Sequence, residues 1–322
     1  MSPRLKRGLA AAVLLSPLAL AAAVALNVRL RETLDRRQAA PPEGRFVPAG
    51  DVELFVSEWG PPGAPVVLFT HGMGAWSGLW GLALGSACRE VRCVAVDQSP
   101  FGYSQRPADS SYDRGASARR LWALADSLGA EKVSIVGHSF GGGAAAEAAL
   151  LHPERVRRLV LIAPALGLGA PPAAPGVAGA LLKRPAVARL VVAATLANPL
   201  LQRRGLARFM ADPSRATPAM AAVLRRPLYS KGFVAGLADW LPRFLFDAET
   251  GLSADPKSYA RLTMPTLLVW GDRDTTTPLP QGEALKALIP GSRLEILPGI
   301  GHMPQLESPA AVQALLAAHL AP

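Results

Sequence analysis

Cysteine is scarce in this chain, because only Cys88 and Cys93 among its 322 residues carry a thiol. Two cysteines five positions apart supply neither a disulfide framework nor the ligand set of a thiolate metal site. We therefore expect two free, half-buried thiols. The alternative is a bond between the two in an oxidising compartment.

Acidic side chains are outnumbered: 24 Asp and Glu stand against 34 Lys and Arg, for a formal net charge of +10. Residues 1–45 hold eight basic and three acidic residues, and residues 166–250 hold eleven and four, so the two segments carry +5 and +7. The rest of the chain is close to neutral. A nucleic-acid enzyme more often has basic charge around its active face, and no RNA- or DNA-binding motif is present. We therefore predict no nucleic-acid partner.

Charge is also absent from Gly8 to Val28, a run of 21 residues between two basic clusters. As a helix this run would extend roughly 31 Å, about the thickness of the hydrocarbon core of a bilayer. We predict that residues 1–44 form a membrane anchor and a tether, with the rest of the chain outside the cytoplasm. The alternative is a cleaved signal peptide and a secreted or periplasmic protein, because the triplet from Ala19 to Ala21 resembles a cleavage site.

One short stretch joins a strand pattern to a helix pattern. The apolar run from Val133 to Val136 ends in Gly137-His-Ser-Phe-Gly141, and an alanine-rich helical pattern follows at once. This spacing is typical of the nucleophile elbow, in which a serine stands on a strained strand-to-helix turn. The flanking glycines let strand and helix approach closely, and the helix directs free N–H groups towards charge that forms at the serine. We therefore predict that Ser139 is a nucleophile.

Strand patterns alternate with helical patterns on both sides of this turn. After a hairpin within 46–59, strands are expected at 66–70, 91–97, 132–137, 156–162, 266–270 and 293–297, with helices at 117–129 and 309–320. This alternation predicts an α/β fold with a doubly wound, mostly parallel sheet. The core is expected to comprise residues 45–164 and 264–322. Residues 165–263 interrupt the alternation and are predicted to form an inserted helical cap over the nucleophile.

A serine nucleophile needs a base, and the base needs an orienting carboxylate. In this kind of fold the acid follows the serine in sequence, and the histidine follows the acid. His302 lies in a glycine-rich loop after a strand, where its side chain can swing to the serine, so we predict it as the base. The acid is expected in the loop after the preceding strand. Asp272 and Asp274 are both candidates there, and we prefer Asp274.

Acyl transfer also needs hydrogen-bond donors for the developing oxyanion. The backbone N–H of Phe140, the residue after the nucleophile, is one expected donor. The other should come from the segment 71–74, whose glycines allow close approach of the backbone, and we assign it to Met73. His71 and His138 flank these features and are interpreted as hydrogen-bonding supports. No metal ion or organic cofactor is implied.

Together these motifs resemble the α/β-hydrolase fold superfamily over residues 45–322. The resemblance rests on His71-Gly72, Asp97 with Gly102-Tyr-Ser104, Gly137-His-Ser-Phe-Gly141, Gly271-x-x-Asp274 and Gly301-His302. In that superfamily the acid usually lies three residues after the glycine, which favours Asp274 over Asp272. The haloalkane dehalogenase and epoxide hydrolase branches have aspartate at the elbow, so Ser139 argues against both.

Three positions depart from patterns in this superfamily. Pro100 stands where relatives commonly have glycine. Relatives that cleave carbon–carbon bonds often have asparagine at the position of His138, and cofactor-free perhydrolases often have methionine at the position of Phe140. The proline bears on the shape of its loop. His138 and Phe140 weaken the interpretations of the chain as a carbon–carbon hydrolase and as a perhydrolase, respectively.

The resemblance implies an esterase-like or lipase-like serine hydrolase. We predict cleavage of a carboxylic ester with an apolar acyl group, through an acyl-enzyme formed by Ser139 with Asp274 and His302. The expected partners are a small-molecule ester and a membrane, contacted by the N-terminal helix and the basic cap. One alternative is carbon–carbon, amide or lactone hydrolysis on the same scaffold. The other is a non-catalytic binding protein that retains the fold.

Overall fold

A mixed sheet forms the centre of the computed structural model, which describes residues 19–168 and 176–321. Within those residues the sheet has eight strands in the order β1-β2-β4-β3-β5-β6-β7-β8. β2 pairs antiparallel with β1 and β4, and all other neighbours are parallel. The strands are β1 (Gly44–Ala49), β2 (Val52–Trp59), β3 (Val66–Thr70), β4 (Arg92–Val96), β5 (Val133–His138), β6 (Val156–Ile162), β7 (Thr266–Gly271) and β8 (Arg293–Leu297).

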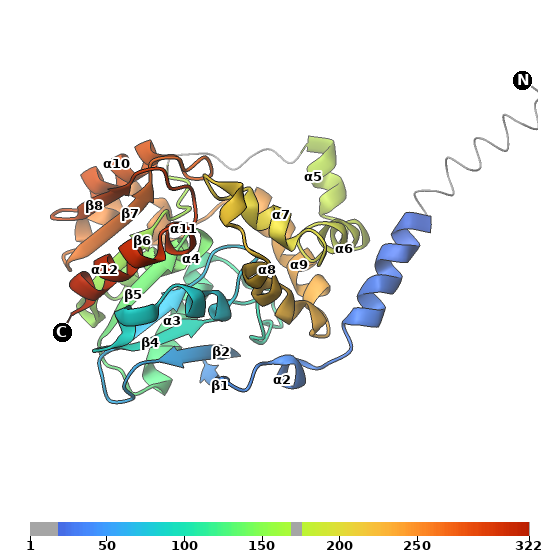
Figure 1. Ribbon diagram of the computed structural model, residues 1–322, viewed down its shortest axis with the longest axis horizontal. Coiled ribbons are helices and arrows are strands. Elements are labelled where there is room, and N and C mark those ends of the chain that lie inside the picture. Colours follow the sequence, from blue (N-terminus) through green and yellow to red (C-terminus); the bar gives the residue numbers. More distant parts are fainter. Residues whose placement is uncertain (1–18, 169–175, 322) are drawn as a thin grey trace, which may run out of the picture.

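Helices cover both faces of this sheet (Figure 1). One face packs against α3 (Arg114–Ser127), α4 (Phe140–Leu151) and α10 (Leu279–Leu288), and the other against α12 (Pro309–Leu320) and two 3₁₀ turns within 77–88. Side chains of β3 alternate accordingly, since Leu68 joins the first core whereas Val67 and Phe69 join the second. The predicted α/β class with a doubly wound, mostly parallel sheet is confirmed.

The predicted strands match the observed ones closely, and β3, β6 and α12 have the predicted bounds. Helix α3 begins three residues earlier than expected, at Arg114. The reason is a cap: the Asp113 carboxylate accepts a hydrogen bond from the backbone N–H of Ala116 at 2.8 Å.

A helical insertion lies between β6 and β7, at the upper right of Figure 1. It consists of α5 (Gly176–Leu182), α6 (Pro185–Ala194), α7 (Gln202–Ala207), α8 (Pro218–Arg225), α9 (Phe233–Phe246) and short 3₁₀ turns. Helices α6 and α9 pack against each other in a third apolar core, which includes Val192, Leu237 and Trp240 and also takes in Phe101 from the loop after β4. The short helix α11 (Pro304–Glu307) follows β8.

The predicted membrane anchor is not supported. Its first part lies outside the described residues, and a helix runs through residues 19–31. None of the helices in the described part of the chain is both long and apolar enough to cross a membrane. Val24 and Val28 pack against the helical insertion instead. This finding contradicts the predicted membrane-anchored localisation, and the predicted membrane partner is not supported.

Two smaller predictions also differ from the structure. The tether contains a short helix, α2 (Arg36–Ala39), capped by Asp35. Cys88 and Cys93 form a disulfide, so the prediction of free thiols is wrong. The chain turns back between them from a 3₁₀ turn into β4, which leaves their Cα atoms 5.7 Å apart, within the range that a disulfide spans.

Candidate active site

Ser139 stands at the turn between β5 and α4. Its backbone has φ 51° and ψ −120°, a conformation that residues other than glycine rarely adopt. Two glycines make the tight turn possible. A Cβ on Gly137 would lie 2.6 Å from the Cβ of Ala145, and a Cβ on Gly141 would lie 2.6 Å from the backbone oxygen of His71. The sequence of the turn therefore fixes the position of the serine side chain.

The structure brings Ser139, Asp274 and His302 together, although they lie in separate loops. The Nε2 atom of His302 lies 2.8 Å from the Oγ of Ser139, and its Nδ1 lies 2.8 Å from Oδ2 of Asp274. Because an ionised carboxylate only accepts hydrogen bonds, the ring proton belongs on Nδ1, and Nε2 is left to accept the hydroxyl proton. All three side chains are buried. The arrangement has the order nucleophile, base and acid.

Asp274 accepts hydrogen bonds from other groups besides His302. Its Oδ1 accepts the backbone N–H groups of Thr276 and Thr277 at 2.8 and 2.9 Å, and its Oδ2 accepts the Thr277 hydroxyl at 2.8 Å. Burial opposes ionisation, but the hydrogen bonds from His302 and Thr277 outweigh it and lower the pKa of the Asp274 carboxyl. Asp272 turns away and accepts the backbone N–H of Gly299 at 2.7 Å.

The predicted oxyanion donors flank the serine. Phe140 follows it directly at the start of α4, and a Cβ on Gly72, the neighbour of Met73, would lie 3.2 Å from the Cβ of Ser139. Among the described residues, neither the N–H of Met73 nor that of Phe140 donates a hydrogen bond. Both groups are therefore free to bind an oxygen atom of a ligand.

Two buried histidines support the loops of the site. His71 accepts the backbone N–H of Gln98 at 3.0 Å through Nε2, so its Nδ1 donates to the Gly72 carbonyl at 2.9 Å. His138 Nε2 lies 2.8 Å from the carbonyl oxygen of His302. Burial lowers the pKa of His71 to about 4 and that of His138 to about 3, so both rings are neutral near pH 7.

Glu307 is a supporting residue that the sequence analysis missed. Its buried carboxylate accepts the backbone N–H groups of Gly301 and Met303, on either side of His302, at 3.1 and 3.2 Å. It also accepts the N–H of Ala211 from the helical insertion at 2.8 Å. Only its position five residues after the histidine marks it in the sequence, and that spacing alone carries no chemical meaning.

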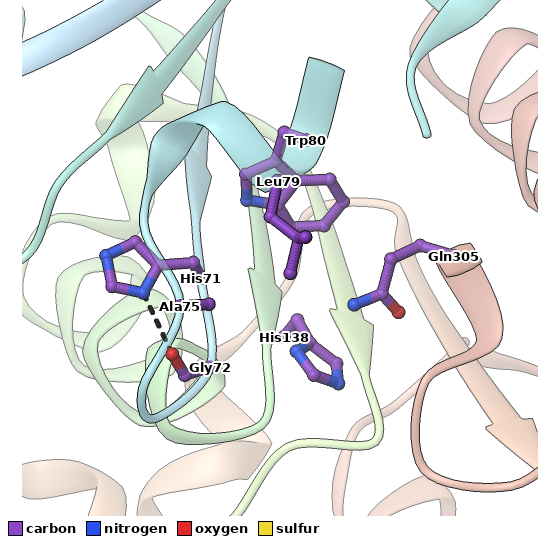
Figure 2. Close-up of a pocket in the computed structure, with 7 residues that line it drawn as sticks. All are labelled: His71, Gly72, Ala75, Leu79, Trp80, His138 and Gln305. Carbon is purple, nitrogen blue, oxygen red and sulfur yellow. Dashed lines mark hydrogen bonds between the residues drawn. The ribbon is translucent and has the colours of Figure 1, made fainter. Parts of the chain in front are cut away.

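A small cavity lies behind these loops (Figure 2). It is lined by His71, Gly72, Ala75, Leu79, Trp80, His138 and Gln305. Its volume of about 10 Å³ suits a single water molecule rather than an organic substrate. Trp80 Nε1 and Gln305 Oε1 have no hydrogen-bond partner within the described part of the chain, so the cavity offers a donor and an acceptor.

An aromatic cluster, defined here as Phe101, Phe140, Trp240 and Phe244, stands beside the serine. The Phe140 ring lies 5.5 Å from that of Trp240 and 5.6 Å from that of Phe244, while Trp240 and Phe244 stack at 4.7 Å. Phe101 packs on Trp240 at 4.9 Å. Because Phe140 directly follows Ser139, these rings give the site an apolar side. In the described residues, no group of three His, Cys, Asp or Glu could hold a metal ion.

Comparisons with known proteins agree with the observed fold. Residues 65–309 match the sequence profile of a family described as alpha/beta hydrolase fold. The chain is 30% identical over 288 residues to the 2-hydroxymuconate semialdehyde hydrolase of Pseudomonas sp. strain CF600, covering 88% of this chain and 96% of that protein.

Two solved structures extend the comparison. A serine hydrolase involved in carbazole degradation has a TM-score of 0.69 and 26% identity, covering 86% of this chain and 98% of the other. A membrane phospholipase A, described as a bacterial virulence factor, has a TM-score of 0.65 and 26% identity, covering 98% of this chain and 100% of the other.

Proposed function

Because the chain belongs to the alpha/beta hydrolase fold family, we propose that it is a serine hydrolase that cleaves a carbon–carbon bond next to a carbonyl group. The proposed substrates are unsaturated keto acids or aldehydes of the 2-hydroxymuconate semialdehyde kind. The observation that carries this proposal is the match to a hydrolase of that compound over nearly the whole of both chains. The proposal is supported by the hydrogen bonds that link Ser139 to His302 and His302 to Asp274.

The proposed reaction begins at the carbonyl carbon beside the bond that breaks. Ser139 Oγ attacks this carbon while His302 Nε2 takes the hydroxyl proton, and Asp274 stabilises the resulting imidazolium. The N–H groups of Met73 and Phe140 hold the oxyanion. Its collapse breaks the carbon–carbon bond and forms an acyl-serine.

The leaving fragment departs as a carbanion and takes its proton from His302. Such a departure requires a second carbonyl group in the fragment, so that the negative charge forms an enolate. Water, deprotonated by His302, then attacks the acyl-serine and releases the carboxylic acid. One water molecule is consumed, and the serine and histidine return to their first states.

Ester hydrolysis, the principal expectation from the sequence, is the second candidate. It uses the same steps, with an alcohol as the leaving group. The specific observation in its favour is the similarity to a phospholipase A over 98% of this chain. The aromatic cluster beside Ser139 fits an apolar acyl group in either reaction.

The test compares kcat/KM for 2-hydroxymuconate semialdehyde with kcat/KM for p-nitrophenyl esters of graded chain length. We expect the semialdehyde to be the better substrate and Ser139→Ala to lose at least about 10³-fold in turnover. If an ester is the better substrate by tenfold or more, the second candidate replaces the first. If Ser139→Ala keeps the activity of the parent protein, both candidates are wrong.

A further inference from the structure

Helix α9, which carries Trp240 and Phe244, has no cap of its own. Its N-cap residue is Gly232, at φ 73°, and no side chain in the helix satisfies the first N–H groups. A carboxylate 200 positions earlier does so: Glu32 accepts the N–H of Gly232 through Oε2 and that of Val234 through Oε1, each at 2.8 Å. A negative charge at this end of a helix is favourable, since the free N–H groups there carry partial positive charge.

Glu32 lies in a segment of residues 28–38, which we call the N-terminal strap. Further contacts attach this strap to the helical insertion. Arg31 Nε donates to the carbonyl of Leu228 at 3.0 Å, and the N–H of Lys231 donates to the carbonyl of Leu34 at 2.8 Å. Val28 packs on the apolar core of the insertion. Figure 1 shows the blue N-terminal helix, which leads into the strap, beside the insertion.

The other end of the strap is attached to the core of the protein. In α2, Arg36 and Arg37 both pair with Glu53 of β2, the latter with an Nη2–Oε2 distance of 2.7 Å. The strap thus spans from β2, the second strand of the sheet, to the first turn of α9. A side chain larger than glycine at position 236 would collide with Arg106, so the same turn of α9 is also packed closely against the loop after β4.

The position of α9 determines the apolar side of the candidate site, because Trp240 and Phe244 contact Phe140 next to the serine. We propose that the N-terminal strap sets this position and that Glu32 is a positioning residue for the aromatic cluster. The strap would thereby tune the affinity for substrates with large apolar groups. Its effect on substrates rests on the proposed function, whereas its effect on α9 does not.

Hydrogen–deuterium exchange of the full chain, read on peptides within 228–246, tests the structural part. Glu32→Ala should speed exchange at the start of α9 about fivefold or more, the loss expected for a helix cap. Glu32→Gln, which retains one acceptor oxygen, should show a smaller effect. Asp255→Ala is the matched control, because this exposed carboxylate caps the 3₁₀ turn at residues 256–261, outside both the strap and α9. Circular dichroism confirms that each variant is folded.

Kinetics test the functional part. In Glu32→Ala, KM for a long-chain p-nitrophenyl ester should rise about fivefold while kcat changes less than twofold, and Asp255→Ala should leave both parameters unchanged. If exchange in α9 is unchanged in Glu32→Ala, or is accelerated equally in Asp255→Ala, the proposal is overturned. Faster exchange in Glu32→Ala, with no hydrolysis of either the semialdehyde or the ester by the parent protein, would contradict the proposed function and leave the strap's role in positioning α9 in place. Faster exchange with an unchanged KM would overturn the link to substrate affinity.

Discussion

Ser139 and His302 lie 163 positions apart in the sequence, yet the serine Oγ is 2.8 Å from the histidine Nε2. The parallel strands explain the contact. Ser139 follows β5 and His302 follows β8, and the carboxyl ends of parallel strands meet at one edge of the sheet. Asp274 follows β7 at the same edge. The fold therefore assembles the site from three loops.

Asp274→Asn should reduce kcat by roughly 10³–10⁴-fold with little change in KM. The amide no longer favours the proton on Nδ1 of His302, so Nε2 is less able to accept the serine proton. Steady-state kinetics with the better substrate measure this. Asp272→Asn is the matched control, since its carboxylate contacts only the loop before the histidine. Equal losses in both variants would show that the assignment of the acid is wrong.

Glu307→Gln should reduce kcat about tenfold and leave KM nearly constant. The variant retains one acceptor oxygen for the three N–H groups that the carboxylate holds, so the loop around His302 shifts from its reactive position. Glu283→Gln, an exposed position on α10, provides the control. A rise in KM with normal kcat would argue that Glu307 shapes substrate binding instead.

Phe244→Ala should raise KM for substrates with large apolar groups about fivefold, because one ring of the aromatic cluster is lost. Short acetyl esters should be affected less. Its neighbour Leu245 is similarly exposed, at 41% against 36%, and lies outside the cluster, so Leu245→Ala is the control. The aromatic cluster has no part in substrate binding if the two variants behave alike.

The buried neutral histidines predict a pH dependence of stability. The folded protein keeps His138 neutral down to about pH 3, whereas an unfolded histidine takes up a proton near pH 6.5. The unfolded state therefore binds more protons below pH 6.5, and this histidine destabilises the fold as the pH falls. Asp97 acts in the opposite direction over the same range, because burial raises its pKa to about 7.

A variant isolates the contribution of His138 from that of Asp97. The free energy of unfolding lost in His138→Gln should be smaller at pH 5 than at pH 7.5 by about 2 kcal/mol, which is about 1.4 kcal/mol for each pH unit below 6.5. Urea titrations at the two pH values measure the difference. The same loss at both values would mean that His138 is not held neutral in the folded protein.

The sequence predicted what local chemistry determines. The strand, turn and helix around Ser139 are one continuous segment, and the glycines that the turn requires are visible in it. The order of the later loops was enough to name His302 and Asp274 as candidates, which the structure brings to the serine.

Contacts between distant segments could not be predicted in this way. The pairing of Glu32 with the first turn of α9 depends on a packing arrangement that no spacing records. The predicted anchor shows the same limit: hydropathy describes an apolar run but not its surroundings, and in the described end of that run Val24 and Val28 pack on protein. The Cys88–Cys93 bond depends on a chain reversal between the two residues.

Labelling with a fluorophosphonate, followed by mass spectrometry of the intact protein and its peptides, tests the central claim most directly. The reagent reacts with serines that a neighbouring base activates, and it requires no knowledge of the substrate. We predict one label on the parent protein, at Ser139, and none on Ser139→Ala. An unlabelled parent protein, or a label that persists in the variant, would contradict the assignment of Ser139 as the nucleophile.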